Sequence, residues 1–142
     1  DCLLVLGYDL IHQGENLDKI KHLLLPNPQS ASLQYYGALM NDDTIGTRIR
    51  DVTRRAKERN INVRWTQEFI SLSMMFIDRE GRSPRVHIEF AMPHLTKNQR
   101  PSITIKKGYH AKTYQDLANA YDRIWEGAHV PNDEEIRQPA VG

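Results

Sequence analysis

A block of basic residues occupies positions 48 to 64. Seven Lys or Arg residues lie within these 17 positions. Arg48 and Arg55 lie two turns apart on an expected helix, and Arg55 and Arg59 are four residues apart, so part of the helix surface is cationic. Such a surface either binds phosphates or nucleic acid, or pairs with acidic groups of the same chain, such as those at 133–135. We favour the second alternative, in which these side chains pair with acidic groups of the same chain. The candidate basic patch comprises Arg48, Arg54, Arg55 and Arg59.

A second candidate site lies where two expected strands end. The apolar run 2–7 is followed by Tyr8, and the alternating run 61–65 ends at Trp65. In open α/β sheets, ligands bind beyond the carboxyl ends of parallel strands. The sequence therefore predicts a pocket bounded by Tyr8, Trp65, Thr66, Gln67 and Ser71.

The histidines and the single cysteine give little support for a metal site. No pair of the six histidines has the i, i+4 spacing of a helical zinc site, and Cys2 alone excludes cysteine-based zinc patterns. His87 and Glu89 share a strand face and would allow a two-ligand site, although a polar, solvent-facing surface is favoured. No Gly-x-Ser-x-Gly elbow is present. We predict no metal and no cofactor.

Hydrophobic periodicity supplies the elements that position these residues. Apolar residues at i, i+4, i+7 and i+11 predict a helix that begins at the 41–44 cluster, and Asn60 suits a turn after it. Thr113 and Asp116 resemble a capping box at the start of the last helix. For the segment 29–40 the sequence allows either a short strand or a loop. The expected strands are 2–7, 61–65, 72–77, 85–90 and 102–106, and the expected helices are 14–25, 44–59 and 113–126.

Length and composition bound the class of protein. The 142 residues suit one domain, and 39% apolar with 26% charged residues argues against a disordered chain. A net charge of +1 gives no case for a polyelectrolyte partner, and no apolar run approaches a membrane span. One cysteine favours a reducing compartment, so we expect a cytoplasmic protein. Because the chain opens at Asp1 without Met, we expect a fragment or processed product.

The segment 56–64 reads Ala-Lys-Glu-Arg-Asn-Ile-Asn-Val-Arg, and an apolar strand ending at Asp78 follows it. This order resembles the core of the phospholipase D-like superfamily, in which such a helix and strand precede a strand with the motif His-x-Lys-x4-Asp. Asp78 falls on the Asp of that motif, Ser71 on the His and Ser73 on the Lys. The helix around 121–125 is similar to the closing helix of the family.

The departures from the motif decide what the resemblance implies. In the family the His is the nucleophile and the Lys stabilises the phosphoryl oxygens. A serine hydroxyl does neither without an adjacent base, so the resemblance implies a scaffold that has lost its catalytic motif. Residues His110-Ala-Lys112 do read His-x-Lys, but the next Asp, Asp116, lies one residue short of the spacing in the family motif. We do not favour it as a displaced motif.

We expect an α/β domain with a mixed sheet sandwiched by helices over 1–130, similar to a phospholipase D-like single repeat, and a flexible polar tail over 131–142.

The leading functional hypothesis is a non-catalytic ligand-sensing or dimerisation module of a larger, bacterial regulatory protein that recognises a phosphorylated or nucleotide-like ligand. The alternatives are a phosphodiesterase or nuclease with an altered site, and a nucleic-acid-binding module using helix 44–59. The family builds its site between two repeats, so a homodimer or a fused neighbour is expected. The ligand-binding candidates are Tyr8, Trp65, Gln67, Ser71, Ser73 and Asp78.

Overall fold

A computed structural model gives the fold, and it describes residues 2–3, 19–68, 70, 72–90, 92 and 94–138. Within these residues, six strands form one sheet in the order β3-β2-β1-β4-β5-β6. Strands β1, β2 and β3 are parallel, β4 is antiparallel to β1 and β5, and β5 is antiparallel to β6. The elements are β1 Cys2–Leu3, β2 His22–Pro26, α2 Ala31–Leu39, α3 Ile45–Glu58, β3 Asn62–Thr66, β4 Leu72–Ile77, β5 Arg85–Phe90, η2 Lys97–Gln99, β6 Ser102–Lys106, α4 Ala111–Gly127 and α5 Asp133–Arg137.

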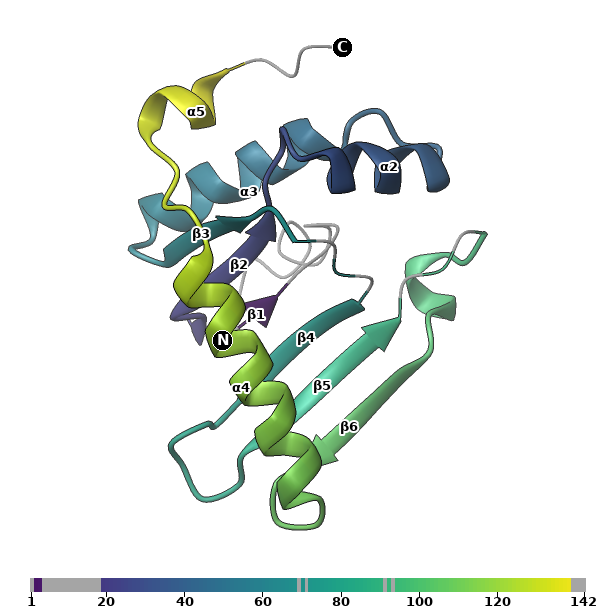
Figure 1. Ribbon diagram of the computed structural model, residues 1–142, viewed down its shortest axis with the longest axis vertical. Coiled ribbons are helices and arrows are strands. Elements are labelled where there is room, and N and C mark those ends of the chain that lie inside the picture. Colours follow the sequence, from purple (N-terminus) through teal and green to yellow (C-terminus); the bar gives the residue numbers. More distant parts are fainter. Residues whose placement is uncertain are drawn as a thin grey trace.

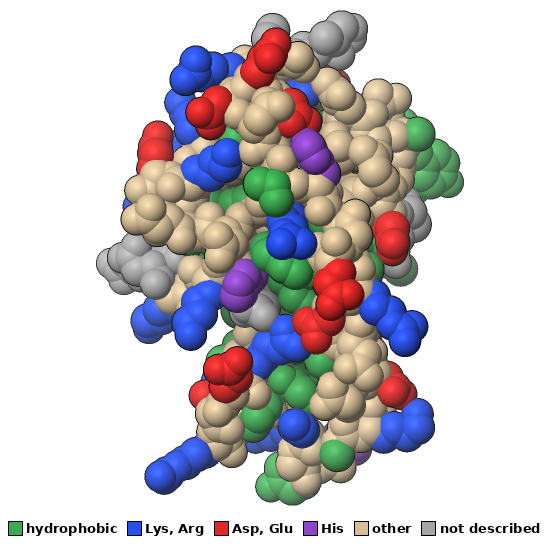
Figure 2. Space-filling model, turned by 60° about the vertical axis from the view of Figure 1, so that its left-hand side comes forward, with side chains coloured by type: hydrophobic (Ala, Val, Ile, Leu, Met, Phe, Trp, Pro, Cys, Tyr) green, Lys and Arg blue, Asp and Glu red, His purple; other side chains and the backbone are tan. Residues whose placement is uncertain are grey.

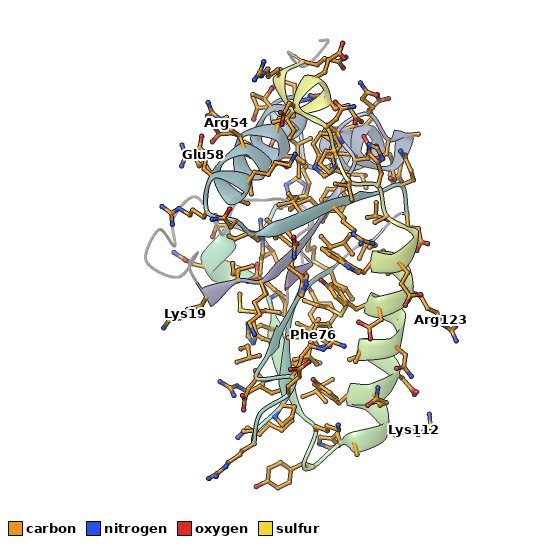
Figure 3. All side chains as sticks on the ribbon, turned by 90° about the vertical axis from the view of Figure 1, so that its left-hand side faces the viewer. Lys19, Arg54, Glu58, Phe76, Lys112 and Arg123 are labelled. Atoms are coloured by element: carbon orange, nitrogen blue, oxygen red, sulfur yellow. The ribbon has the colours of Figure 1, made fainter. Side chains whose placement is uncertain are left out.

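The helices cover both faces of the sheet (Figure 1). Alternation along β2 sends Leu23 and Leu25 to the face under α2 and α3, and Leu24 to the face under α4. Each face has its own hydrophobic cluster. The first cluster joins β2 and β3 to α2 and α3, and the second joins β4 and β5 to Tyr114, Ala118 and Tyr121 of α4. Figure 3 shows Phe76 between the sheet and α4, with Lys112 and Arg123 pointing outward.

The periodicity-based predictions for the middle and end of the chain are confirmed. Helix α3 buries its predicted stripe, which comprises Ile45, Ile49, Val52 and Ala56, and Asn60 has the positive φ of a turn residue. Strands β3, β4, β5 and β6 and helix α4 lie where they were expected, and β4 and β5 form an antiparallel hairpin. The chain is therefore an α/β protein with a mixed sheet between helices. No helix in the described part of the chain is long and apolar enough to cross a membrane.

The predicted helix over 14–25 is wrong from residue 22 onward. Residues 22–26 form β2, in which Leu23, Leu24 and Leu25 are each 0% exposed. Three consecutive leucines buried on opposite faces fit a central strand with a core on both sides, whereas a helix at one face would bury only a stripe. Residues 14–18, and the predicted strand beyond Leu3, lie outside the described residues.

Three smaller features also differ from the expectations. The open segment 29–40 contains α2, whose first turn is capped because Ser30 Oγ accepts from the Leu33 N–H at 3.2 Å. No capping box forms at Thr113, because α4 starts at Ala111 and the Asp116 carboxylate instead accepts from Lys112 Nζ at 2.7 Å. Residues 133–137, expected in a flexible tail, form α5 with a capping box between Asn132 and Glu135.

Candidate functional site

Strand direction decides which candidate residues meet. Parallel strands β2 and β3 end at the same edge of the sheet where antiparallel β4 begins and β5 ends. This carboxyl edge therefore carries Gln67, just after β3, and Ser73, near the start of β4. Tyr8 and Ser71, which were predicted to line the same pocket, lie outside the described residues.

Trp65 belongs to the hydrophobic core. Its side chain is 2% exposed, and its indole Nε1 donates to Thr53 Oγ1 at 3.0 Å from α3 above it. Its backbone exchanges two hydrogen bonds with His129, at 2.7 and 2.8 Å, which closes the outer edge of β3. Thr66 is also buried, whereas Gln67 is exposed. At this edge the indole of Trp65 thus packs against α3, and Gln67 offers an accessible side chain.

A partly buried ion pair lies beside Ser73. Ser73 of β4 is directly opposite Glu89 of β5, so both side chains are on one face and in close approach. Arg100, in the link between η2 and β6, donates from Nη1 to Glu89 Oε1 at 3.0 Å. The Arg100 side chain is 6% exposed and that of Glu89 is 20% exposed. Arg100 Nε is buried and has no hydrogen-bond acceptor among the described residues.

Helix α2 also contributes a residue close to the Arg100–Glu89 pair. Ser32 Oγ donates to the Gln67 carbonyl oxygen at 3.3 Å, which ties the first turn of α2 to the end of β3. One turn later comes Tyr36, which is buried. Burial raises the pKa of the Tyr36 phenol, and the positive charge of Arg100 acts in the opposite direction. Tyr36 belongs to the hydrophobic cluster on this face of the sheet, against which Met75 of β4 also packs. We call Tyr36, Ser73, Glu89 and Arg100 the edge cluster.

The sequence pointed to only part of the edge cluster. Ser73 came from the motif comparison, and Glu89 was noticed only as a partner of His87 in a metal site. In the structure the His87 ring Nδ1 lies 3.0 Å from Thr104 Oγ1. Within the described residues, no group of three or more His, Cys, Asp or Glu side chains is arranged to hold a metal ion. Arg100 follows a short irregular link, where periodicity gives no signal.

Asp78 lies at the opposite end of the sheet from Ser73. Five residues of extended strand separate them, about 17 Å at the usual rise. Asp78 has φ 56° and starts the β4–β5 turn, where its carboxylate accepts from the Ser83 N–H at 2.8 Å. A Cβ on Gly81 would lie 1.7 Å from the same carboxylate, so a larger residue there would displace the Asp78 side chain. In this structure Asp78 therefore acts as a turn residue, apart from the edge cluster.

A cavity of about 960 Å³ lies at this opposite end, between the start of β2 and α4. On its wall, the His22 and Trp125 rings pack edge to face, with their centroids 5.2 Å apart. Arg79 Nη2 lies 3.0 Å from both carboxylate oxygens of Asp122. Burial, followed by nearby positive charges including that of Arg79, lowers the pKa of His22. The formal charges along this wall cancel. The lining includes three acidic and three basic residues, which are Asp78, Glu80, Asp122, Lys19, Lys21 and Arg79.

The basic helix pairs largely with groups of its own chain. Arg48 forms an ion pair with Asp42, and both Arg54 and Arg55 pair with Asp51. Lys57 Nζ donates to the Pro131 carbonyl oxygen at 2.9 Å and lies 3.7 Å from Asp133. Acidic and basic side chains are interspersed over the face drawn in Figure 2. Three of the four residues that were expected to form a basic patch are thus ion-paired, with Arg54 and Arg55 sharing one carboxylate.

Comparisons with known proteins found no matching family model, no matching curated protein and no matching solved structure.

Proposed function

We propose that this chain is a non-catalytic ligand-binding module with a phospholipase D-like single-repeat architecture, and that it recognises a phosphorylated small molecule at the edge cluster. The observation that carries the proposal is Arg100, a guanidinium that is 6% exposed and whose buried Nε–H has no acceptor among the described residues. Buried polar groups in proteins are almost always hydrogen-bonded, so such a group calls for a missing partner.

A phosphoryl oxygen is a suitable partner for this nitrogen. Arginine recognises phosphate and carboxylate oxygens through its planar set of donors, and such charge-assisted hydrogen bonds are about twice as strong as neutral ones. Glu89 already occupies Nη1, which fixes the orientation of the guanidinium. Ser73 and the buried Tyr36 also carry hydroxyl groups on this side of the sheet. These groups supply a guanidinium N–H, whose charge is shared with Glu89, and two hydroxyl groups that a phosphate ester would contact.

Binding without catalysis fits the residues at the motif positions. Under the resemblance, Ser71 and Ser73 replace the nucleophilic His and the phosphate-binding Lys. A serine nucleophile needs an adjacent general base, and the carboxylate opposite Ser73 is bonded to Arg100. We propose that Arg100, from another part of the chain, supplies the positive charge that the Lys of the motif provides in the family. We also propose that the module pairs with a second copy or a fused neighbour, as the resemblance implies, and serves a regulatory protein.

Calorimetric titration of the whole chain with a nucleoside monophosphate, its unphosphorylated nucleoside and inorganic phosphate tests this proposal. We expect saturable binding that requires the phosphate and weakens at least tenfold in Arg100→Lys, which keeps the charge but loses the Nε–H. Arg82→Gln, in the exposed β4–β5 turn, should bind like the wild type. Equal binding of the nucleoside, or no loss in Arg100→Lys, would contradict the proposal. Hydrolysis of a generic phosphodiester that is lost in Ser73→Ala would instead support the enzyme alternative.

A further inference from the structure

A second buried arginine lies on α3. Arg50 is 8% exposed. Its Nε donates to the backbone carbonyl oxygen of Glu135 at 3.1 Å, and no carboxylate among the described residues forms an ion pair with it. Burial lowers the pKa of the Arg50 guanidinium, with no opposing contribution from a nearby acid. A buried charge without a counter-charge is strongly unfavourable, which distinguishes Arg50 from the paired arginines of the same helix.

The Arg50 side chain lines a cavity of about 580 Å³ formed by α2, the start of α3 and the residue that follows α5. Gly46 lines it too, and a Cβ placed there would lie 3.7 Å from Arg50 Nη1. The guanidinium therefore lies beside a glycine that leaves room next to it. Amide side chains and a few apolar groups make up much of the remaining wall, including Gln29, Gln34, Gln138, Leu33 and Ile45.

The start of α3 adds a second source of positive potential at the same cavity. The first N–H groups of a helix have no acceptor within the helix. Thr44, the N-cap residue of α3, makes no side-chain cap hydrogen bond, and Ile45 and Gly46 of the first turn line the cavity. Of the two acids nearby, Asp42 is ion-paired with Arg48 and bonded to Thr44, and Asp43 lies at the exposed rim.

We propose that this cavity is a second, independent binding site, which takes a small organic anion whose phosphate or carboxylate group lies between Arg50 and the first turn of α3. The amide groups of Gln29, Gln34 and Gln138 then bind the polar remainder of the molecule. The site lies outside the motif resemblance and does not depend on the function proposed for the edge cluster. Because Glu135 of α5 bonds to Arg50, an occupied cavity also stabilises the packing of α5 on α3.

Thermal unfolding of the whole chain tests this site in a Glu89→Gln/Arg100→Met background, which removes the edge cluster as an anion site. The probes are inorganic phosphate, glucose 6-phosphate and succinate, compared with chloride at matched ionic strength. We expect at least one probe to raise the Tm saturably, since a ligand that binds only the folded state stabilises it. The phosphates and succinate separate the two kinds of anion.

Three further substitutions in this background assign the effect. Arg50→Met should weaken the effective probe at least tenfold. Gly46→Ala, a favourable change in helix propensity, should weaken it several-fold while the fold is retained. Arg54→Met, on the exposed side of α3, should leave the effect unchanged; Figure 3 shows Arg54 pointing away from the sheet. The proposal is overturned if no probe shifts the Tm, or if the shift survives both Arg50→Met and Gly46→Ala.

Discussion

Arg100 Nη1 lies 3.0 Å from Glu89 Oε1, and the two side chains are 6% and 20% exposed. Removal of Glu89 leaves the Arg100 charge buried alone, which costs about 3–5 kcal/mol, whereas replacement of both partners by uncharged groups is often close to neutral. Removal of Arg100 leaves a carboxylate that is only partly buried. We therefore expect Glu89→Gln to lower the free energy of unfolding by about 3 kcal/mol and Arg100→Met to lower it by less. The double variant should lose much less than the sum of the two. Urea unfolding of the four proteins measures this coupling.

Strictly additive losses would contradict a direct interaction between the two side chains. Lys112→Met and Asp116→Asn provide a matched control, because that pair on α4 is fully exposed. Surface pairs of this kind contribute little, so neither change should be readily measurable.

The indole hydrogen bond in the core gives a second prediction. Thr53→Val removes the acceptor of Trp65 Nε1 with little change of shape, and leaves that N–H buried and unbonded. We expect a loss of about 1–3 kcal/mol in stability. The same change should cost less in a Trp65→Phe background, where the N–H is absent. Thr47→Val on the exposed side of α3 should be nearly neutral; an equal loss there would point to the helix rather than the hydrogen bond.

The burial of Trp65 also illustrates what the sequence could predict. Alternation identified β3 and β5, a continuous apolar run identified β4, and a four-residue stripe identified α3. The same reasoning placed Trp65 at the carboxyl edge, but whether a strand-end aromatic enters a pocket or the core depends on the helix packed above it. Strand β2 was missed because Leu17, Ile20 and Leu24 lie near helical spacing, whereas the leucines at 23–25 are buried on two faces of a strand.

The edge cluster was harder to predict than the fold. Arg100 is separated from Glu89 by a polar link, and its burial results from tertiary packing that leaves no local pattern. Helix α2 was unclear for a similar reason, since its buried residues are few and comprise Leu33, Tyr36 and Gly37.

The paired arginines of α3 predict weak nucleic-acid binding. Arg54 and Arg55 both pair with Asp51, so they are partly neutralised before any phosphate arrives. We expect binding to a DNA duplex to be weak and to depend little on salt, with less than a threefold change in Arg54→Ala/Arg55→Ala. Fluorescence anisotropy between 50 and 200 mM salt checks this. A steep slope of log K against log salt that falls by about 2 in the double variant would support a nucleic-acid interface instead.

His22 predicts a loss of stability in mild acid. Its pKa in the folded protein lies below the ordinary value of 6.5, mainly because of burial. The unfolded chain therefore binds a proton first as the pH falls, so stability present above about pH 6.5 is lost below it. Urea unfolding at pH 8 and pH 5 should show a smaller loss in His22→Gln than in the wild type. His110→Gln, at an exposed position, should follow the wild type; an unchanged loss in His22→Gln would rule out His22 as the cause.

The most direct test of the proposed function is to observe the Arg100 Nε–H itself. Nitrogen-15 NMR of the whole chain resolves arginine Nε–H signals, and the one that disappears in Glu89→Gln/Arg100→Met is assigned to Arg100. On titration with a nucleoside monophosphate, the account predicts that this signal shifts saturably, and that the unphosphorylated nucleoside leaves it in place. An Arg100 signal that stays unchanged at saturating nucleoside monophosphate and inorganic phosphate would contradict the account.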